Sequence, residues 1–252
     1  MQKTIVVIPC YNEAERLKVD EFNYLLDQPG LELLFVNDGS MDNTEQLLKE
    51  LIKKNSPGAN LLNLSKNQGK AEAVRQGMLY AIDQGASMTG FIDADMATPS
   101  KEVLRLLDKA KKGRRSVILG SRVRLLGNTI DRRPMRHYIG RIFATFASLI
   151  LRLPVYDTQC GAKLFIASPL LKESLTEPFC SRWIFDVELI GRLLTGSDNF
   201  KPLTADDFIE VPLKEWMDVK GSKITFLDFV KAARDLMKIA IRLKRKRQKT
   251  IK

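Results

Sequence analysis

The chain has 252 residues, of which 44% are hydrophobic and 28% charged, a composition typical of a globular protein with a buried core. Its longest strongly apolar run, residues 142–151, is about half a membrane span, and the apolar run at the N-terminus is too short for a signal peptide, so we expect neither a transmembrane helix nor a leader. A single histidine argues against a Ser-His-Asp triad or a histidine-rich metal site, and three cysteines without metal-ligand spacing predict reduced thiols of a cytosolic compartment.

The net charge of +11 is concentrated in two segments. Residues 105–141 carry twelve basic and two acidic side chains, and residues 231–252 carry ten basic and one acidic, so the rest of the chain is acidic. Basic patches of this kind favour anionic partners such as phosphates, a membrane surface or nucleic acid, and a merely solvated tail is the simpler alternative.

Apolar runs alternate with helical patterns in the first half of the chain. We predict strands over residues 3–9, 31–37, 59–64, 88–93 and 115–121, and helices from near Asp42 to 54, over 70–85 and over 100–113. Asp42 and Glu45 are expected to form a capping box, and Gly113 to end the third helix. This alternation predicts a mostly parallel sheet covered by helices on both faces, with ligands at the carboxyl ends of the strands, where PCYNE, NDGS, DAD and GSR fall.

The C-terminal segment, residues 224–249, has the pattern of a basic amphipathic helix. One stripe is apolar and other sides carry Lys and Arg; the stripe consists of Phe226, Val230, Ala233, Met237 and Ala240. Such a helix fits an in-plane membrane anchor recruited by anionic lipids. The alternative is a helix packed on the body and followed by a solvated tail.

The acidic pair in TGFIDADMATP, Asp93 and Asp95, follows a predicted strand. Two carboxylates this close repel each other, so either a cation lies between them, or one is protonated, or the strand has ended and they diverge. Pro99 favours a strand that has ended by then, and an acidic solvated turn is the simplest alternative. No G-x-G-x-x-G follows the first strand, and NQGKAEA lacks two features of a P-loop, which argues against dehydrogenases and P-loop kinases.

The chain contains, in this order from residue 4 to about residue 224, the motifs VVIPCYNE, FVNDGSMDNT, NQGKAEAVRQG, IDADMATP, GSR, DTQCGAKLF, RWIFDVEL and EVPLKEWMDVKGSKI. In these it resembles the inverting nucleotide-sugar glycosyltransferases of the family that contains the polyprenyl-phosphate hexosyltransferases, dolichyl-phosphate glucosyltransferases above all. The resemblance implies a glycosyltransferase A fold and a UDP-sugar donor, with UDP-glucose favoured. It divides the chain into one catalytic domain over residues 1–222, with a nucleotide-sugar half to about 125 and an acceptor half over 126–222, and a basic helix and tail over 223–252.

The resemblance also implies a donor site built around Mg²⁺ or Mn²⁺. Asp95 is the expected ligand, and Asp93 is expected near the ribose or the outer shell of the metal. Some relatives carry a polar side chain where this chain has Ala97, so the protein's share of the coordination sphere is expected to be thin. The residues expected to bind the nucleotide, with Asp38 at the uracil or ribose, are Pro9, Tyr11, Glu13, Asp38, Lys70, Asp93, Ala94 and Asp95.

On the acceptor side, a lipid phosphate is already an anion and mainly needs positioning, a task for which arginine is well suited. Arg122, Arg132 and Arg136 are the candidates for this role. Asp186 is a candidate base, or a residue that orients the acceptor loop and the sugar; the catalytic set is therefore Asp95, Asp186 and Arg122. An alternative keeps the donor chemistry but uses a sugar hydroxyl as acceptor, with Asp186 as base.

We therefore expect a metal-dependent hexosyltransferase that moves a sugar to a polyprenyl phosphate, bound peripherally at the cytoplasmic face of an anionic membrane. Because relatives often carry transmembrane anchors, a membrane-anchoring partner subunit is considered as well. Nucleic acid is not an expected partner, since the chain shows no recognition motif and the acidic strand ends would repel it.

Overall fold

The computed structural model describes residues 3–131, 134–218 and 226–250, without the side chains of 134–137, 226–230 and 249–250. Five strands form where they are predicted: β1 (Thr4–Cys10), β2 (Leu31–Asn37), β3 (Ala59–Asn63), β4 (Met88–Ile92) and β5 (Val117–Ser121). Each is a short, largely apolar run, and all but the edge strand β3 are almost wholly buried. With β7 (Ala162–Ile166) and β8 (Phe208–Pro212) they make one sheet in the order β3-β2-β1-β4-β7-β5-β8. Every pairing in it is parallel except those of β7, so the predicted mostly parallel sheet is confirmed.

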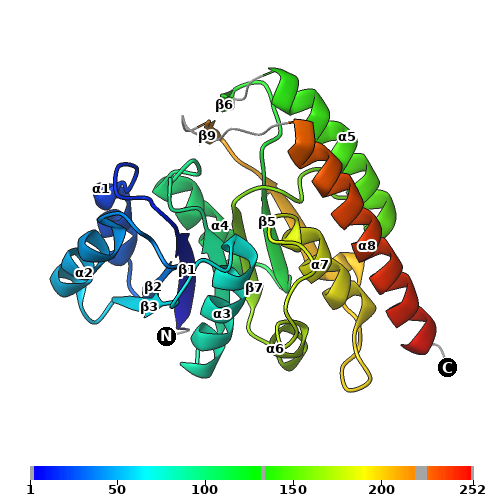
Figure 1. The fold of residues 1–252 in the computed structure, drawn as a ribbon, viewed down its shortest axis with the longest axis horizontal. Helices are drawn as coiled ribbons and strands as arrows, with labels where there is room; N and C mark the ends of the chain where they lie inside the picture. Colours follow the sequence, from blue (N-terminus) through cyan, green and yellow to red (C-terminus); the bar gives the residue numbers. More distant parts are fainter. Residues whose placement is uncertain (1–2, 132–133, 219–225, 251–252) are drawn as a thin grey trace.

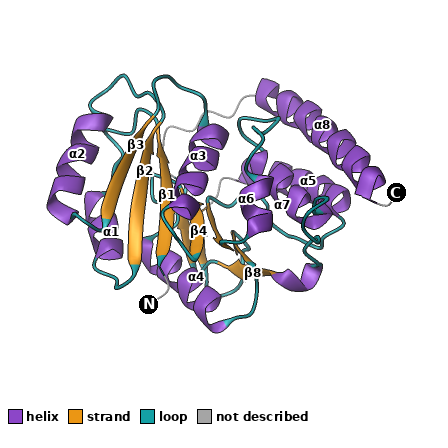
Figure 2. Ribbon diagram, turned by 90° about the horizontal axis from the view of Figure 1, so that it is seen from below, coloured by secondary structure: helices purple, strands orange, loops and turns teal. Residues whose placement is uncertain are grey.

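The helices cover both faces of the sheet (Figure 2). Along β1, Ile5 and Val7 face one layer, while Val6 and Ile8 face the other. The first layer packs under α3 (Lys70–Asp83), α5 (Pro134–Leu151), α6 (Pro169–Ser174), α7 (Phe185–Thr195) and α8 (Phe226–Thr250). The second layer packs under α1 (Val19–Leu26), α2 (Thr44–Asn55) and α4 (Ser100–Lys112).

The start of α2 differs from the expected capping box. Asp42 lies outside the helix and accepts from the backbone N–H of Thr44 at 3.0 Å and from that of Ala14 at 3.1 Å, while Glu45 pairs with Lys49 one turn on at 2.7 Å. Asp42 therefore joins the start of α2 to the loop after β1. The end of α4 at Gly113 is as predicted.

The second half of the chain adds a small second sheet of β6 (Thr129–Asp131) and β9 (Glu215–Met217), and a short helix, η1 (Ala205–Asp207). Helices α5 and α8 lie side by side at one edge of the molecule (Figure 1). Arg247 joins them, since its guanidinium donates to the carbonyls of Ile150 and Leu151 at 3.3 and 3.4 Å. Among the described residues, no helix combines the length and apolarity needed to cross a bilayer.

Helix α8 packs on the body, and it does so along a face other than the predicted stripe. Leu236, Ile239 and Leu243 are buried against α7, where a Cβ added to Gly191 would lie 2.9 Å from Leu243 Cδ2. Of the predicted stripe, Met237 is exposed, and the side chains of Phe226 and Val230 lie outside the described residues. The residues that pack recur with the helical spacing on a different side of the helix.

Candidate functional site

A cavity of about 570 Å³ opens at the carboxyl ends of β1, β2 and β4, beside the N-terminus of α3. This is where strand order reverses, since β2 lies on one side of β1 and β4 on the other, and such switch points form crevices in open sheets. The lining contains all eight residues predicted for the donor site: Pro9, Tyr11, Glu13, Asp38, Lys70, Asp93, Ala94 and Asp95. The structure thus brings the eight together, and their individual roles remain predictions.

Asp93 is the first residue after β4, and its Oδ1 pairs with Nζ of Lys70 at the start of α3. Burial lowers the pKa of Lys70, but Asp93 and Asp186 outweigh that effect and leave this pKa above its ordinary value. Gly161 makes room for the carboxylate, because a Cβ at that position would overlap Asp93 Cγ and Oδ2. The Asp93 backbone N–H also donates to the Gly161 carbonyl at 3.0 Å, so the two residues are fixed against each other.

Asp95 lies in the turn after β4, which ends at Ile92, so the strand has ended before the acidic pair, as one of the three alternatives expects. Met96 turns the chain with a φ of 48°, and the N–H of Ala97 donates to Asp95 Oδ1 at 3.0 Å. Burial raises the pKa of Asp95, and the charge of Asp93 raises this pKa further. The two carboxylates therefore repel each other, although both lie in the turn after β4 and not in the strand itself.

Glu13 adds a third carboxylate to the same cavity. Burial raises the pKa of Glu13 to about 7, with Arg16 acting to lower it and Asp95 to raise it. Arg16 donates to one oxygen at 2.8 Å, while the buried Oε2 has no hydrogen-bond partner among the described residues.

This donor set fits a divalent cation, because oxygen ligands suit Mg²⁺ and Mn²⁺ and a cation would relieve the repulsion between the carboxylates. No group of three or more His, Cys, Asp or Glu residues surrounds one point in the parts of the chain that the structure describes. The expected thin protein share of the coordination sphere stays a prediction.

Asp38 is buried, and both of its oxygens hold the loop before α3. They accept from the backbone N–H groups of Gln68 and Gly69, each at 2.7 Å. Arg182 holds the loop from the other side: it donates to Asn67 Oδ1 at 2.5 Å, and a Cβ on Gly69 would lie 3.1 Å from its Nη2. The sequence reasoning missed Arg182, although it directly precedes the cavity residue Trp183.

Asp186, in the first turn of α7, forms a buried ion pair. Its Oδ1 lies 2.6 Å from Nζ of Lys163 on β7. The Lys163 side chain is 1% exposed, and its Nζ lies 5.2 Å from the centre of the Phe91 ring. Burial raises the pKa of Asp186, while Lys163 and Lys70 act to lower it. The sequence reasoning missed Lys163; the signal is a lysine inside the apolar strand AKLFI, since lysine is almost never fully buried unless paired.

The structure describes the three predicted acceptor arginines to different extents. Arg122 is mostly buried, and its Nε and Nη2 form a bidentate pair with Asp157 at 2.7 and 2.8 Å. Burial acts to lower the pKa of Arg122, but the charge of Asp157 and the hydrogen bonds to it outweigh that effect. The pKa of Arg122 is therefore above its ordinary value. Arg132 lies outside the described residues, and of Arg136 only the backbone, in the first turn of α5, is described. An acceptor-binding role for these three stays a prediction.

The loop between α6 and α7, which carries Trp183, is tied to two helices. Glu188 of α7 accepts from the backbone N–H of Cys180 at 2.7 Å and from Arg192 at 2.8 Å. From α8, Arg242 donates to Glu188 at 3.2 Å and to Glu177 at 2.6 Å. The last helix is thus bonded to the segment that borders the cavity.

Comparison with known proteins identifies relatives over most of the chain. Residues 5–172 match the family model described as glycosyl transferase family 2. Dolichyl-phosphate beta-glucosyltransferase of Saccharomyces cerevisiae is 32% identical, over 92% of this chain and 72% of the relative, and that of Drosophila melanogaster is 34% identical, over 94% and 74%.

Among solved structures, glucosyl-3-phosphoglycerate synthase from Mycobacterium tuberculosis in complex with Mn²⁺ and UDP-glucose superposes with a TM-score of 0.69. The match covers 96% of this chain and 79% of that one at 19% identity, so it establishes a shared fold and no more.

Proposed function

Because the chain belongs to glycosyl transferase family 2 and has the glycosyltransferase A fold, we propose that it transfers glucose from UDP-glucose to a dolichyl-type polyprenyl phosphate, with inversion at the anomeric carbon. The observation that carries the proposal is the single cavity that gathers Lys70, Asp93 and Asp95 with the other predicted donor residues. The names of the relatives support glucose and the lipid acceptor, and the UDP-glucose complex of the structural neighbour supports the donor.

On this proposal, Asp95, assisted by Asp93, would hold Mg²⁺ or Mn²⁺ in the donor site. When bound, the cation neutralises the negative charge that develops on the departing diphosphate. Lys70 holds Asp93 in place by their ion pair, and Asp38 and Arg182 fix the loop that carries Lys70. These residues bind and orient the donor before any bond changes.

In the transfer step, an oxygen of the acceptor phosphate forms a bond to the anomeric carbon from the side opposite UDP. The bond from that carbon to the β-phosphate oxygen breaks, and UDP leaves with the electron pair. No proton has to be removed, because the phosphate is already ionised. We assign the acceptor phosphate to Arg132 and Arg136, with Arg122 contributing from its Nη1 side while Asp157 holds the rest of its guanidinium.

The alternative of a sugar-hydroxyl acceptor needs Asp186 as a base in contact with that acceptor. The burial that raises the pKa of Asp186 would suit a base. Asp186 is buried, however, and the residues that line the cavity do not include it. Arg122 is likewise absent from that lining, so our choice of the phosphate acceptor rests on the names of the relatives. We assign Asp186 to holding α7 through its ion pair with Lys163.

We further propose that the enzyme works at the cytoplasmic face of a membrane, bound peripherally by the basic end of α8, with or without an anchoring subunit. A polyprenyl phosphate is available only at a bilayer, and residues 231–252 carry a net charge of +9. Each basic residue near an anionic surface contributes on the order of 1 kcal/mol.

The test is turnover of radiolabelled UDP-glucose, UDP-galactose and GDP-mannose by the purified chain with dolichyl phosphate, with the Asp95→Asn variant as control. We expect label from UDP-glucose to enter the organic phase as a product that mild acid hydrolyses. Label that stays in the aqueous phase, or that moves to a glycan, would reject the lipid acceptor.

A further inference from the structure

Helix α5 carries an apolar stripe that the rest of the described structure does not cover. Tyr138, Ile142, Phe146 and Leu149 are 69%, 61%, 55% and 69% exposed. Their spacing of four, four and three residues places them along one side of the helix. The opposite side holds the buried residues Ala144, Ala147 and Leu151, so α5 is apolar on the side that faces the core and on the side that faces outward.

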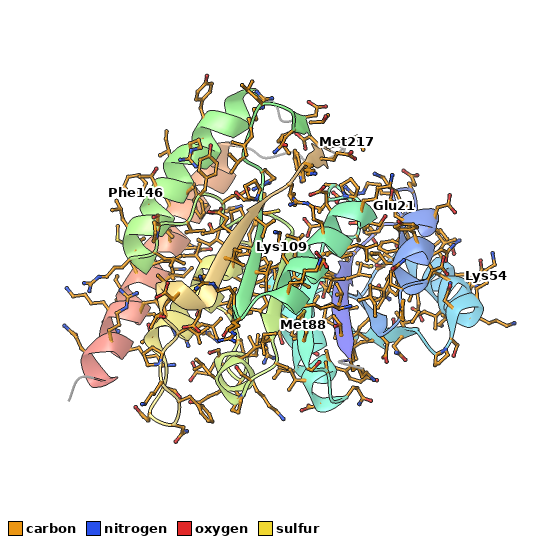
Figure 3. All side chains as sticks on the ribbon, turned by 180° about the vertical axis from the view of Figure 1, so that it is seen from behind. Glu21, Lys54, Met88, Lys109, Phe146 and Met217 are labelled. Carbon is orange, nitrogen blue, oxygen red and sulfur yellow. The ribbon has the colours of Figure 1, made fainter. Side chains whose placement is uncertain are left out.

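Helix α8 adds exposed apolar residues at the same edge of the molecule. Met237 and Ile241 are 64% and 47% exposed, on the side of α8 opposite its buried Leu236, Ile239 and Leu243. The hydrogen bonds from Arg247 to the end of α5 keep the two helices adjacent. Figure 1 shows the pair at the edge, and Figure 3 shows Phe146 on the side of α5 turned away from the sheet. We call this the outer face; it consists of Tyr138, Ile142, Phe146, Leu149, Met237 and Ile241.

The charges beside the outer face are almost all positive. From residue 231 to 249, α8 carries nine Lys and Arg and one acidic residue, Asp235, which lies 3.4 Å from Lys238. Lys231, Arg234, Lys244 and Arg245 are exposed. A patch of large apolar side chains bordered by one sign of charge marks an interaction site whose partner is apolar and anionic.

We propose that the outer face of α5 and α8 rests on an anionic lipid bilayer, with its aromatic and aliphatic side chains inserted at the headgroup boundary and the basic side chains of α8 on lipid phosphates. This deepens the proposed function and rests on it, because it supplies the orientation in which a lipid acceptor reaches the enzyme. A second copy of the chain is the weaker choice of partner, since it would bring two basic helices together.

The position of α5 in the chain supports a bilayer as the partner. The helix begins at Pro134, two residues after Arg132 in the sequence, and Arg136 belongs to its first turn. These two arginines are the residues that we assign to the acceptor phosphate. A bilayer against the outer face therefore places the plane of lipid phosphates beside the start of α5, where that phosphate is needed.

The test compares co-sedimentation of the full chain with vesicles of phosphatidylcholine alone and of phosphatidylcholine with phosphatidylserine. The variant Ile142→Ser with Phe146→Ser removes two side chains of the outer face and leaves every basic residue in place. The matched control, Tyr24→Ser with Met41→Ser, removes two exposed apolar side chains, 45% and 84% exposed, that lie outside α5 and α8.

We expect the α5 variant to bind anionic vesicles about tenfold more weakly than the parent chain, and the control variant to bind like the parent. Both should melt at the parent's temperature, because the altered residues are exposed. Since α8 keeps its charges, raising the salt should weaken binding of the parent and release the α5 variant first. Equal binding by parent and α5 variant would overturn the proposal. So would a parent dimer in gel filtration that the α5 variant abolishes without change in vesicle binding.

Turnover with a short-chain, water-soluble polyprenyl phosphate separates this inference from the proposed function. If the α5 variant keeps parental turnover with that acceptor and loses vesicle binding, both the proposed bilayer contact of the outer face and the proposed function are supported. If the parent binds vesicles through the outer face and fails to use any polyprenyl phosphate, the surface stands and the proposed acceptor is wrong.

Discussion

Replacing Gly161 by alanine is predicted to displace Asp93 and thereby to impair the donor site. An added Cβ would overlap Asp93 Cγ and Oδ2 and would lie 2.8 Å from Oδ1. Carbon and oxygen atoms without a bond between them need more than 3 Å, so the carboxylate would have to retreat by about 1 Å. Gly161 is not among the glycines with positive φ, so alanine is compatible with the backbone there and the effect comes from the contact alone.

The magnitude follows from that displacement. A misplacement of about 1 Å in a site that positions reacting groups lowers the rate by about 100-fold, and overpacking a buried position costs about 1–3 kcal/mol of unfolding free energy. We expect kcat/KM for glucose transfer to fall about 100-fold, and the affinity for UDP with Mn²⁺ to fall with it, while the protein still folds.

The assay pairs transfer kinetics and calorimetry of UDP binding with thermal unfolding, and Gly85→Ala is the control. Gly85 has a φ of 76° and nothing within 4 Å of an added Cβ, so alanine there costs about 1–2 kcal/mol through the backbone and should not reach the site. If Gly161→Ala keeps parental kcat/KM, or if both variants lose activity in proportion to stability, the reasoning about the Asp93 contact is refuted.

Three further tests, with five substitutions in all, address the remaining assignments. Asp95→Asn should abolish transfer, as a chelator should in the parent, without changing the melting temperature; a near-native rate would exclude Asp95 as the ligand. Lys163→Met should cost about 3–5 kcal/mol in urea unfolding because it leaves Asp186 buried without its cation, and adding Asp186→Leu should recover most of that loss. Arg132→Ala with Arg136→Ala should raise KM for the polyprenyl phosphate at least about tenfold while UDP affinity by calorimetry is unchanged; a matched loss of UDP affinity would place both on the donor diphosphate.

The first half of the fold was predictable from sequence because each strand there is an apolar run closed by polar residues. The donor site follows from the same pattern, since the carboxyl ends of parallel strands meet at one edge and bring Asp38 and Asp93 together. In the second half, the C-terminal helix was predictable and is present as α8, but the part of the sheet there was not, because β7 runs antiparallel between β4 and β5 and carries Lys163, a charged residue in an apolar run. Neither feature has a periodic signature.

The residues missed in the site share a physical reason. Gly161 matters only because Asp93 lies against it, and Arg182 only because the loop at Gly69 comes within reach. Such roles are set by contacts between segments distant in the chain, which spacing within a motif does not reveal. The side of α8 that packs on the body could not be read from the sequence for a related reason: the helix has apolar residues on more than one side, and only contact with α7 decides which of them is buried. The predicted membrane-facing stripe stays a prediction.

The bonds of Arg242 have a practical consequence for anyone who shortens this protein to make it easier to handle. A fragment ending before α8 would leave Glu188 with one cation in place of two, and would open the groove that Leu236, Ile239 and Leu243 fill. It would also cut the link from the C-terminal helix to the loop that bears Trp183. Kinetic constants measured on such a fragment would describe a loosened cavity mouth, so the last helix should be kept in every preparation whose donor specificity is to be compared with that of the whole chain.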